Sequence, residues 1–91
     1  MKESGLWKKM ITLSERQESI LMSMMALVEE LGRIPSIRQI AEDEGLSLSA
    51  VRYNLDAIER KGYVTRIKGH YKVLKWVDGT SLELRYIYEY E

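Results

Sequence analysis

The chain has 91 residues, and its 14 Lys and Arg side chains balance 14 Asp and Glu side chains, so the formal net charge is zero. This length suits one small domain with a single core. The chain has no Cys and one His, which excludes disulfides, thiolate metal sites and multi-His zinc sites, and we expect no cofactor and no metal. We find no run of about 18 apolar residues and no signal-peptide pattern, so we expect no membrane contact and an intracellular, cytoplasmic location.

Residues 14–31 are predicted to form an amphipathic helix, because their apolar side chains recur at helical spacing. Ser14 and Gln17 fit a capping box at its start, and Gly32 fits the left-handed cap at its end. We interpret the methionines in its middle as core residues. A methionine-rich partner surface is the alternative. These methionines are Met22, Met24 and Met25.

Two further helices are predicted after Pro35. The first covers residues 36–44, with a second capping box at Ser36, and ends at Gly45. The second covers residues 47–61, starts at Ser47 and ends before Gly62. Its apolar stripe consists of Val51, Leu55 and Ile58, so the opposite face is polar. Two helices joined by a short turn with a glycine are typical of a helix-turn-helix.

Beyond Gly62 the hydrophobic period changes from 3.6 to 2. Residues 63–67 and 71–77 flank a basic turn, Lys68-Gly69-His70, and predict a β-hairpin. A second turn signal at Asp78-Gly79 precedes an alternating, tyrosine-rich segment that predicts a third strand, with a helix capped by Thr80 as the alternative. We therefore expect an α+β fold: a winged helix-turn-helix at 14–76, an N-terminal extension at 1–13 and a C-terminal extension at 77–91.

Charge is distributed unevenly along the chain. Residues 47–76 carry seven Lys and Arg against two acids, whereas 29–46 and 77–91 are each acidic. Phosphate attraction is local, because it falls off within a Debye length of about 10 Å. The basic segment 47–76 therefore favours a nucleic-acid partner despite the zero net charge of the chain. A solvated surface of mixed charge is the alternative.

Residues 13–76 resemble the N-terminal winged-helix DNA-binding domain of the LexA repressors. The resemblance rests on LSERQ at 13–17, IPSIRQIAEDEGLS at 34–47, VRYNLDAIERKGYV at 51–64 and VLKW at 73–76. In that family a self-cleaving domain with a Ser nucleophile and a Lys base follows. We expect no such activity here, since the sequence ends at Glu91. No nucleophile–base pair or glycine-rich phosphate loop occurs either, so we expect no enzyme.

The resemblance implies that the helix at 47–61 enters the major groove of DNA and that the wing at 64–75 contacts the backbone. The candidate DNA-binding residues are Ser36, Arg38, Ser47, Ser49, Ala50, Arg52, Tyr53, Arg66, Lys68, His70 and Lys72. Arg52 is the leading candidate for reading a base, because its guanidinium fork fits guanine. An ion pair with Asp56 is its alternative role. The alternative role of the serines is to cap the helices. The alternative role of the charged wing residues is to protect the edge of the strand from pairing with another chain.

If Leu74 and Trp76 face the helices, as the family pattern implies, then Tyr71, Val73 and Val77 face the other way. Such a second apolar face needs a cover, which predicts a homodimer or a partner protein at the C-terminal strand. The leading function is sequence-specific binding of double-stranded DNA by a small transcriptional regulator, or by a mobile-element repressor or accessory factor. A protein-interaction module that uses the tyrosine-rich strand is the alternative.

Overall fold

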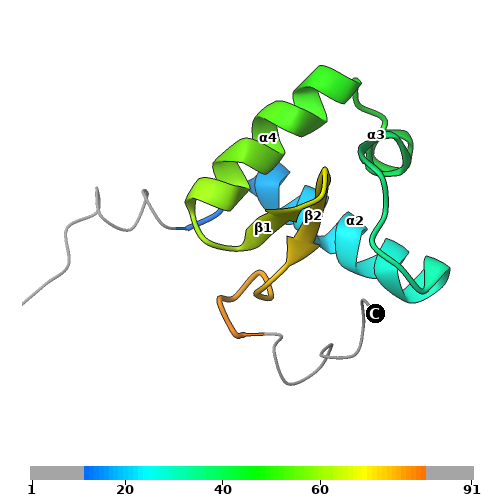
Figure 1. Cartoon of the computed structure of the whole chain (residues 1–91). Coiled ribbons are helices and arrows are strands. Elements are labelled where there is room, and N and C mark those ends of the chain that lie inside the picture. Colours follow the sequence, from blue (N-terminus) through cyan, green and yellow to red (C-terminus); the bar gives the residue numbers. More distant parts are fainter. Residues whose placement is uncertain (1–11, 82–91) are drawn as a thin grey trace, which may run out of the picture.

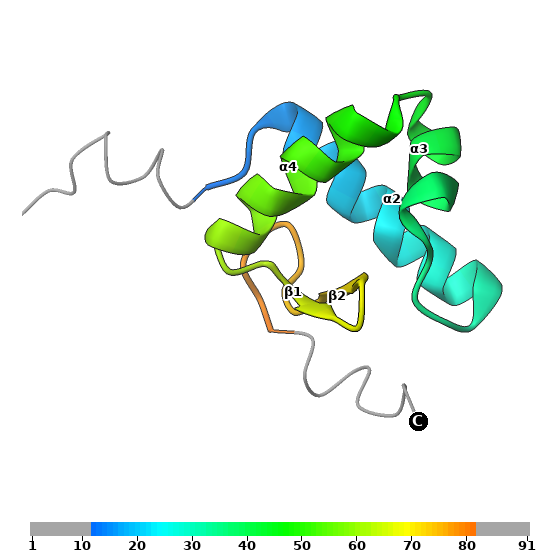
Figure 2. The same cartoon turned by 45° about the horizontal axis from the view of Figure 1, so that its top comes forward.

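The computed structural model describes residues 12–81, which form three helices and one antiparallel hairpin. The elements are α2 (Glu15–Leu31), α3 (Ile37–Glu44), α4 (Leu48–Arg60), β1 (Val64–Ile67) and β2 (His70–Val73). The helices pack across one another, and the hairpin lies against α2 and α4 (Figures 1 and 2). This is the expected α+β winged-helix arrangement. The expected third strand continues into residues 82–91, which lie outside the described residues, as do residues 1–11 of the expected extension.

The helices begin where the sequence places their caps. The Ser14 hydroxyl accepts from the Gln17 amide at 3.2 Å, and the Gln17 side chain accepts from the Ser14 amide at 2.9 Å. Ser36 and Gln39 form the same reciprocal pair at the start of α3. Each box satisfies two amide groups that have no partner inside a helix. Both predicted capping boxes are therefore confirmed, and they set the α2 and α3 boundaries.

The core forms where the three helices meet. Ile20, Leu21 and Met24 of α2 are fully buried, and so are all three residues of the predicted α4 stripe. Ile40 and Ala41 of α3 complete this cluster. The methionine prediction is confirmed for Met24 and Met25, but it is wrong for Met22, which is 58% exposed. The burial of one α4 stripe fixes which residues of that helix face outward.

The hairpin faces the helices in a different register from the one predicted. Val64 pairs with Val73 and Arg66 with Tyr71, which puts these four side chains on one face of the ribbon. Tyr71 is only 5% exposed, and Val73 packs against the core, whereas Leu74 is exposed. The prediction that Tyr71 and Val73 face away is therefore wrong, and so is the inward prediction for Leu74.

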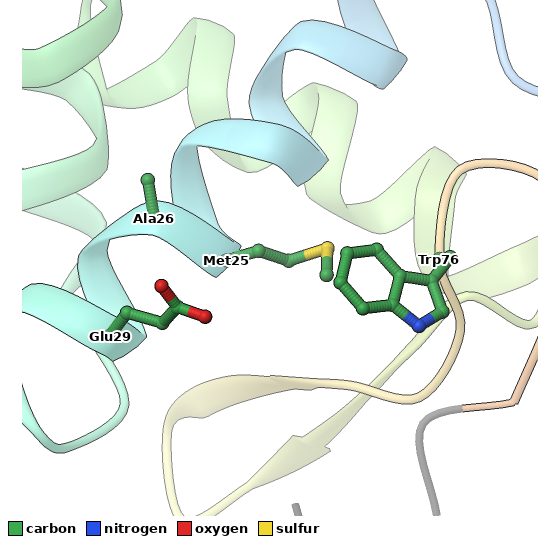
Figure 3. A pocket seen from close by; sticks show the side chains of 4 residues that line it. All are labelled: Met25, Ala26, Glu29 and Trp76. Carbon is green, nitrogen blue, oxygen red and sulfur yellow. The ribbon is translucent and has the colours of Figure 1, made fainter. Parts of the chain in front are cut away.

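The chain bends after β2, so the alternation does not continue to Val77. Trp76 packs against the core as predicted, but Val77 also packs there, which contradicts its outward prediction. Figure 3 shows Met25 of α2 extending toward the Trp76 ring. A hollow of about 190 Å³ lies beside them, with Ala26 and Glu29 on its wall. The apolar second face that predicted a dimer thus loses the residues that β2 was expected to supply.

A turn at Asp78-Gly79 returns the chain toward the hairpin. The Trp76 amide donates to the Thr80 carbonyl at 2.8 Å, and Lys75 pairs with Ser81 in an antiparallel bridge. The Asp78 carboxylate accepts from the Thr80 amide, which holds the pKa of that carboxyl below its usual value. The second predicted turn is confirmed, and the described chain ends one residue into its far arm.

Two hydroxyl–carboxylate hydrogen bonds join α2 to α3. Ser19 donates to Glu44 at 2.8 Å, and Ser23, a buried polar residue, donates to Asp43. Two acids at the end of α3, Asp43 and Glu44, thus take part in helix packing. These bonds hold α3 in place against α2, and α3 in turn leads directly into α4.

Candidate nucleic-acid interface

The outward face of α4 begins at its capped N-terminus. The Ser47 hydroxyl accepts from the Ala50 amide at 3.1 Å, so the predicted alternative role of Ser47 as a cap is confirmed. Ser49 caps nothing. Its hydroxyl lies 3.4 Å from that of Ser47 and is exposed. Ala50 is half-buried. The first turn therefore presents one structural serine and one serine with little internal role.

Arg52 and Tyr53 project from the second turn of α4. Both are exposed, Tyr53 to 73%. Arg52 makes no hydrogen bond or ion pair within residues 12–81, and the alternative pair with Asp56 is not formed. A long cationic side chain with no internal partner is available to bind an external anion or a base edge. Among the candidates on α4, Arg52 is the one with the charge and the freedom to do so.

The start of α3 supplies a second group. Ser36 is occupied as a cap, as its alternative role predicted. Arg38, in the first turn, is exposed and has no hydrogen bond or ion pair in the described part of the chain. The free amides of a capped helix start and a nearby arginine form an environment that favours phosphate. This position suits a backbone contact rather than base reading.

The wing supplies the third group. Its turn places Lys68 at φ 49° and Gly69 at φ 85°, the backbone of a type I′ turn. Lys68 and His70 are exposed at the tip, where a ring nitrogen of His70 lies 3.3 Å from the Lys68 carbonyl oxygen. Lys72 pairs with Thr65 on the outer face of the ribbon and is half-buried. The tip therefore exposes one lysine and the only histidine side chain of the protein.

Arg66 lies on the opposite face, turned toward α4. Its Nη2 donates to Asp56 Oδ1 at 3.0 Å and also to the Tyr71 hydroxyl, and its guanidinium lies 4.9 Å from the centre of the Tyr71 ring. The Tyr71 hydroxyl donates to the same Asp56 oxygen at 2.9 Å. We call Asp56, Arg66 and Tyr71 the wing clasp. The sequence pattern does not identify Tyr71 as part of this group, because the expected register placed it on the other face, whereas the structure pairs it opposite Arg66.

Burial raises the pKa of the Tyr71 phenol, and the hydrogen bond to Asp56 and the negative charge of Asp56 act in the same direction. The hydroxyl therefore stays protonated at neutral pH and remains a donor. Asp56 receives two donors at one oxygen, one of them cationic. This offsets much of the negative charge that its carboxylate would otherwise present to a phosphate.

Residues of α3, α4 and the wing line one hollow. It has a volume of about 250 Å³ and is lined by Ile37 of α3, Arg52 and Asp56 of α4, and Arg66, Gly69 and Tyr71 of the wing. Segments separated by more than thirty residues in the sequence thus contribute to a single surface. Of the candidate DNA-binding residues, Arg52 and Arg66 line the hollow, whereas α3 and the wing turn contribute Ile37 and Gly69, each next to candidates in the sequence.

Within residues 12–81 we find no group of three or more His, Asp or Glu side chains that could hold a metal ion. None of the helices in that same range is long and apolar enough to span a bilayer.

Comparisons with known proteins agree with this geometry. The family model described as the LexA DNA binding domain matches residues 10–72. The LexA repressor of Thermobifida fusca is 48% identical over 56 residues, which cover 60% of this chain and 22% of that protein. The LexA repressor of Mycobacterium leprae is 49% identical over 55 residues, covering 59% and 23%. The LexA repressor of Leptospira interrogans is 28% identical over 71 residues, covering 78% and 35%. The chain thus spans about a third or less of the length of these relatives.

Proposed function

This chain belongs to the family of LexA DNA-binding domains, and on that premise we propose that it binds a specific sequence in double-stranded DNA and regulates transcription there. The observation that carries the proposal is the hollow at which α3, α4 and the wing meet. A winged helix that reads duplex DNA needs a helix for the major groove and basic groups beside it for the backbone. Here Arg52 of α4, which has no hydrogen bond or ion pair within residues 12–81, lines the hollow together with Arg66 of the wing.

The contacts divide into two classes. Arg52 reads a base edge, and Ser49, Ala50 and Tyr53 approach the same groove, where a methyl group or a hydroxyl completes the contact. Phosphates are contacted by the other basic residues of α3 and the wing, which are Arg38, Lys68, His70 and Lys72. The exposed part of the Arg66 side chain also contacts a phosphate. Ser36 and Ser47 contribute through the helix starts that they cap. Base contacts set the sequence and phosphate contacts set the position of the protein on the duplex.

The proposal is tested first by binding. Purified protein is titrated into a labelled pool of random duplexes of about 30 base pairs, and fluorescence anisotropy is followed from about 50 to 300 mM salt. Four or five phosphate contacts predict a slope of log affinity against log salt of roughly −3 to −5. A preferred site is then selected from the pool. Absence of binding at 50 mM salt contradicts the proposal.

Two variants separate base reading from general attraction. Arg52→Ala is expected to weaken binding to the selected site about tenfold more than binding to random duplexes, since a bidentate arginine contributes roughly 1–3 kcal/mol of discrimination. Arg16→Ala is the matched control, because it removes the same charge from an exposed position in the first turn of α2. Equal losses on selected and random duplexes would remove Arg52 from the base-reading role.

We also propose that residues 77–91 bring two copies together, or bring in a partner protein, which suits a protein that reads paired half-sites. The turn at Asp78-Gly79 and the bridge from Lys75 to Ser81 support this, because they bring the chain back beside the segment that follows β2. Sedimentation of the whole chain over a range of concentrations tests it. Such a regulator, of chromosomal or mobile-element origin, works in the cytoplasm on the nucleoid.

A further inference from the structure

We propose that the wing clasp sets the angle between the wing and α4, so that Asp56 and Tyr71 are positioning residues for DNA recognition that do not themselves touch DNA. This inference rests on the proposed function. It assigns a role to a buried tyrosine and to an acid on a surface that otherwise attracts phosphate.

The wing needs support from the helices. It is a ribbon of two strands with four paired positions, and an isolated ribbon of this size is at best marginally stable in water. It is joined to α4 only through the short turn at Lys61 and Gly62. At its base Val64 is buried and Val73 packs against the core, and these apolar contacts hold the ribbon to the helices but are not directional. A directional contact farther along the ribbon is what fixes its angle.

The clasp is such a contact. Arg66 comes from β1, Tyr71 from the opposite position on β2, and both donate to one oxygen of Asp56 on α4. The Tyr71 ring is almost fully buried, which leaves its hydroxyl a single direction in which to point. Arg66 and Asp56 alone form an ion pair with side chains 52% and 45% exposed, a kind of pair that adds little to stability. The tyrosine is the part that gives the clasp its geometry.

The clasp is placed where its geometry matters for recognition. Asp56 lies one helical turn after Arg52 on α4, and both line the same hollow as the wing turn residue Gly69. A small rotation of the ribbon would therefore move the wing tip relative to the arginine proposed to read bases. Specific binding needs both contacts in register, whereas non-specific binding depends only on charge. Loosening the clasp is expected to reduce selectivity more than total affinity.

The test compares two tyrosine-to-phenylalanine variants. Tyr71→Phe removes the hydroxyl from the clasp and leaves the charge and ring in place. Tyr63→Phe is the matched control, because Tyr63 is also buried in this region but its hydroxyl makes no hydrogen bond within the described residues. We expect Tyr71→Phe to lower the ratio of affinities for selected and random duplexes at least threefold, with the salt slope unchanged. Tyr63→Phe is expected to keep the wild-type ratio.

Asp56→Ala provides an independent variant should Tyr71→Phe fold poorly. It removes a carboxylate, so affinity for every duplex rises, but the ratio of selected to random affinity is expected to fall at least threefold. A purely structural or purely electrostatic role would leave that ratio at the wild-type value. Wild-type ratios in both variants would overturn the proposal.

Residual dipolar couplings of the free protein test the clasp without DNA. The couplings of β1 and β2 relative to those of α4 report the angle of the wing, and we expect them to change in Tyr71→Phe but not in Tyr63→Phe. Unchanged couplings in Tyr71→Phe overturn the inference even if the selectivity of that variant for DNA falls. If the wild-type protein selects no duplex, the proposed function fails, and the couplings alone decide whether the clasp sets the wing angle.

Discussion

Ser47 holds the first turn of α4 through its own hydroxyl, and this single contact separates it from its neighbour Ser49. Loss of a serine cap costs a helix about 1 kcal/mol, because one amide at the helix start loses its partner. Ser47→Ala is therefore expected to lower the free energy of unfolding by about 1 kcal/mol. Ser49→Ala is expected to change it by less than about 0.5 kcal/mol, as for an ordinary surface substitution.

Urea unfolding measures both serine variants, and the duplex titration then separates their roles. If Ser49 contacts DNA, Ser49→Ala weakens binding while stability is retained. Equal stability of the two variants would show that the cap does not control the start of α4.

The turn of the wing combines an unfavourable backbone with a useful charge. Lys68 has φ 49°, in the left-handed region that costs an ordinary residue about 1 kcal/mol, whereas asparagine is tolerated there and favours this turn type before glycine. Lys68→Asn is expected to stabilise the chain by less than about 1 kcal/mol and to weaken DNA binding. The salt slope should fall by about one, since one phosphate contact is lost.

Lys68→Gln is the matched control for the turn. It removes the same charge without easing the backbone, so it is expected to lower the salt slope equally while leaving the unfolding free energy near the wild-type value. Identical unfolding free energies for the Asn and Gln variants would mean that the backbone conformation of Lys68 costs the fold nothing measurable.

The elements differ in how far the sequence predicts them, and the wing shows why. The capped helices are local: Ser36 and Gln39 satisfy each other three residues apart, so their pattern predicts both the start and the type of the element. The inward face of β2 is not local. It depends on the strand ending at Val73 rather than continuing to Val77, and on Asp56 offering the Tyr71 hydroxyl a partner fifteen residues away. A period of two predicts alternation, but not the point at which it stops.

In the candidate site, too, local features follow from the sequence and contacts between distant residues do not. The exposed position of Arg52 follows from the buried stripe of its own helix, and the sequence predicts it well. The partner of Arg66 does not follow from any local spacing, because it requires the fold to bring β1 against α4. Asp56 pairs with Arg66 instead of Arg52, and Arg52 has no hydrogen bond or ion pair within residues 12–81. The contact between Asp56 and Arg66, which distinguishes Arg52 as the unpaired arginine of the site, is thus visible only in the tertiary structure.

The domain formed by residues 12–81 depends on one core, because α2, α3, α4 and the hairpin all pack on the same buried cluster. Leu55 is fully buried in it, on the inner face of the helix that carries Arg52. Leu55→Ala is expected to cost about 2–5 kcal/mol, since it removes apolar atoms and leaves a cavity. Small domains have only about 5–15 kcal/mol in total, so this variant should lie near the edge of folding.

Because the core is shared, the parts of the molecule are expected to unfold together. Helix content by circular dichroism and the fluorescence of Trp76, in a Trp7→Phe background that leaves a single tryptophan, should give coincident unfolding curves.

In Leu55→Ala both curves should shift to lower urea concentration by the same amount, and DNA binding should be lost with them. Met22→Ala, at an exposed position of α2, is the control and should shift neither curve. If the helix curve moved without the Trp76 curve, the segment after β2 would be a separate unit rather than part of the domain. The loss of binding in Leu55→Ala would then follow from the helices alone. Coincident curves would instead tie the integrity of the candidate interface to the same buried leucine that turns Arg52 toward solvent.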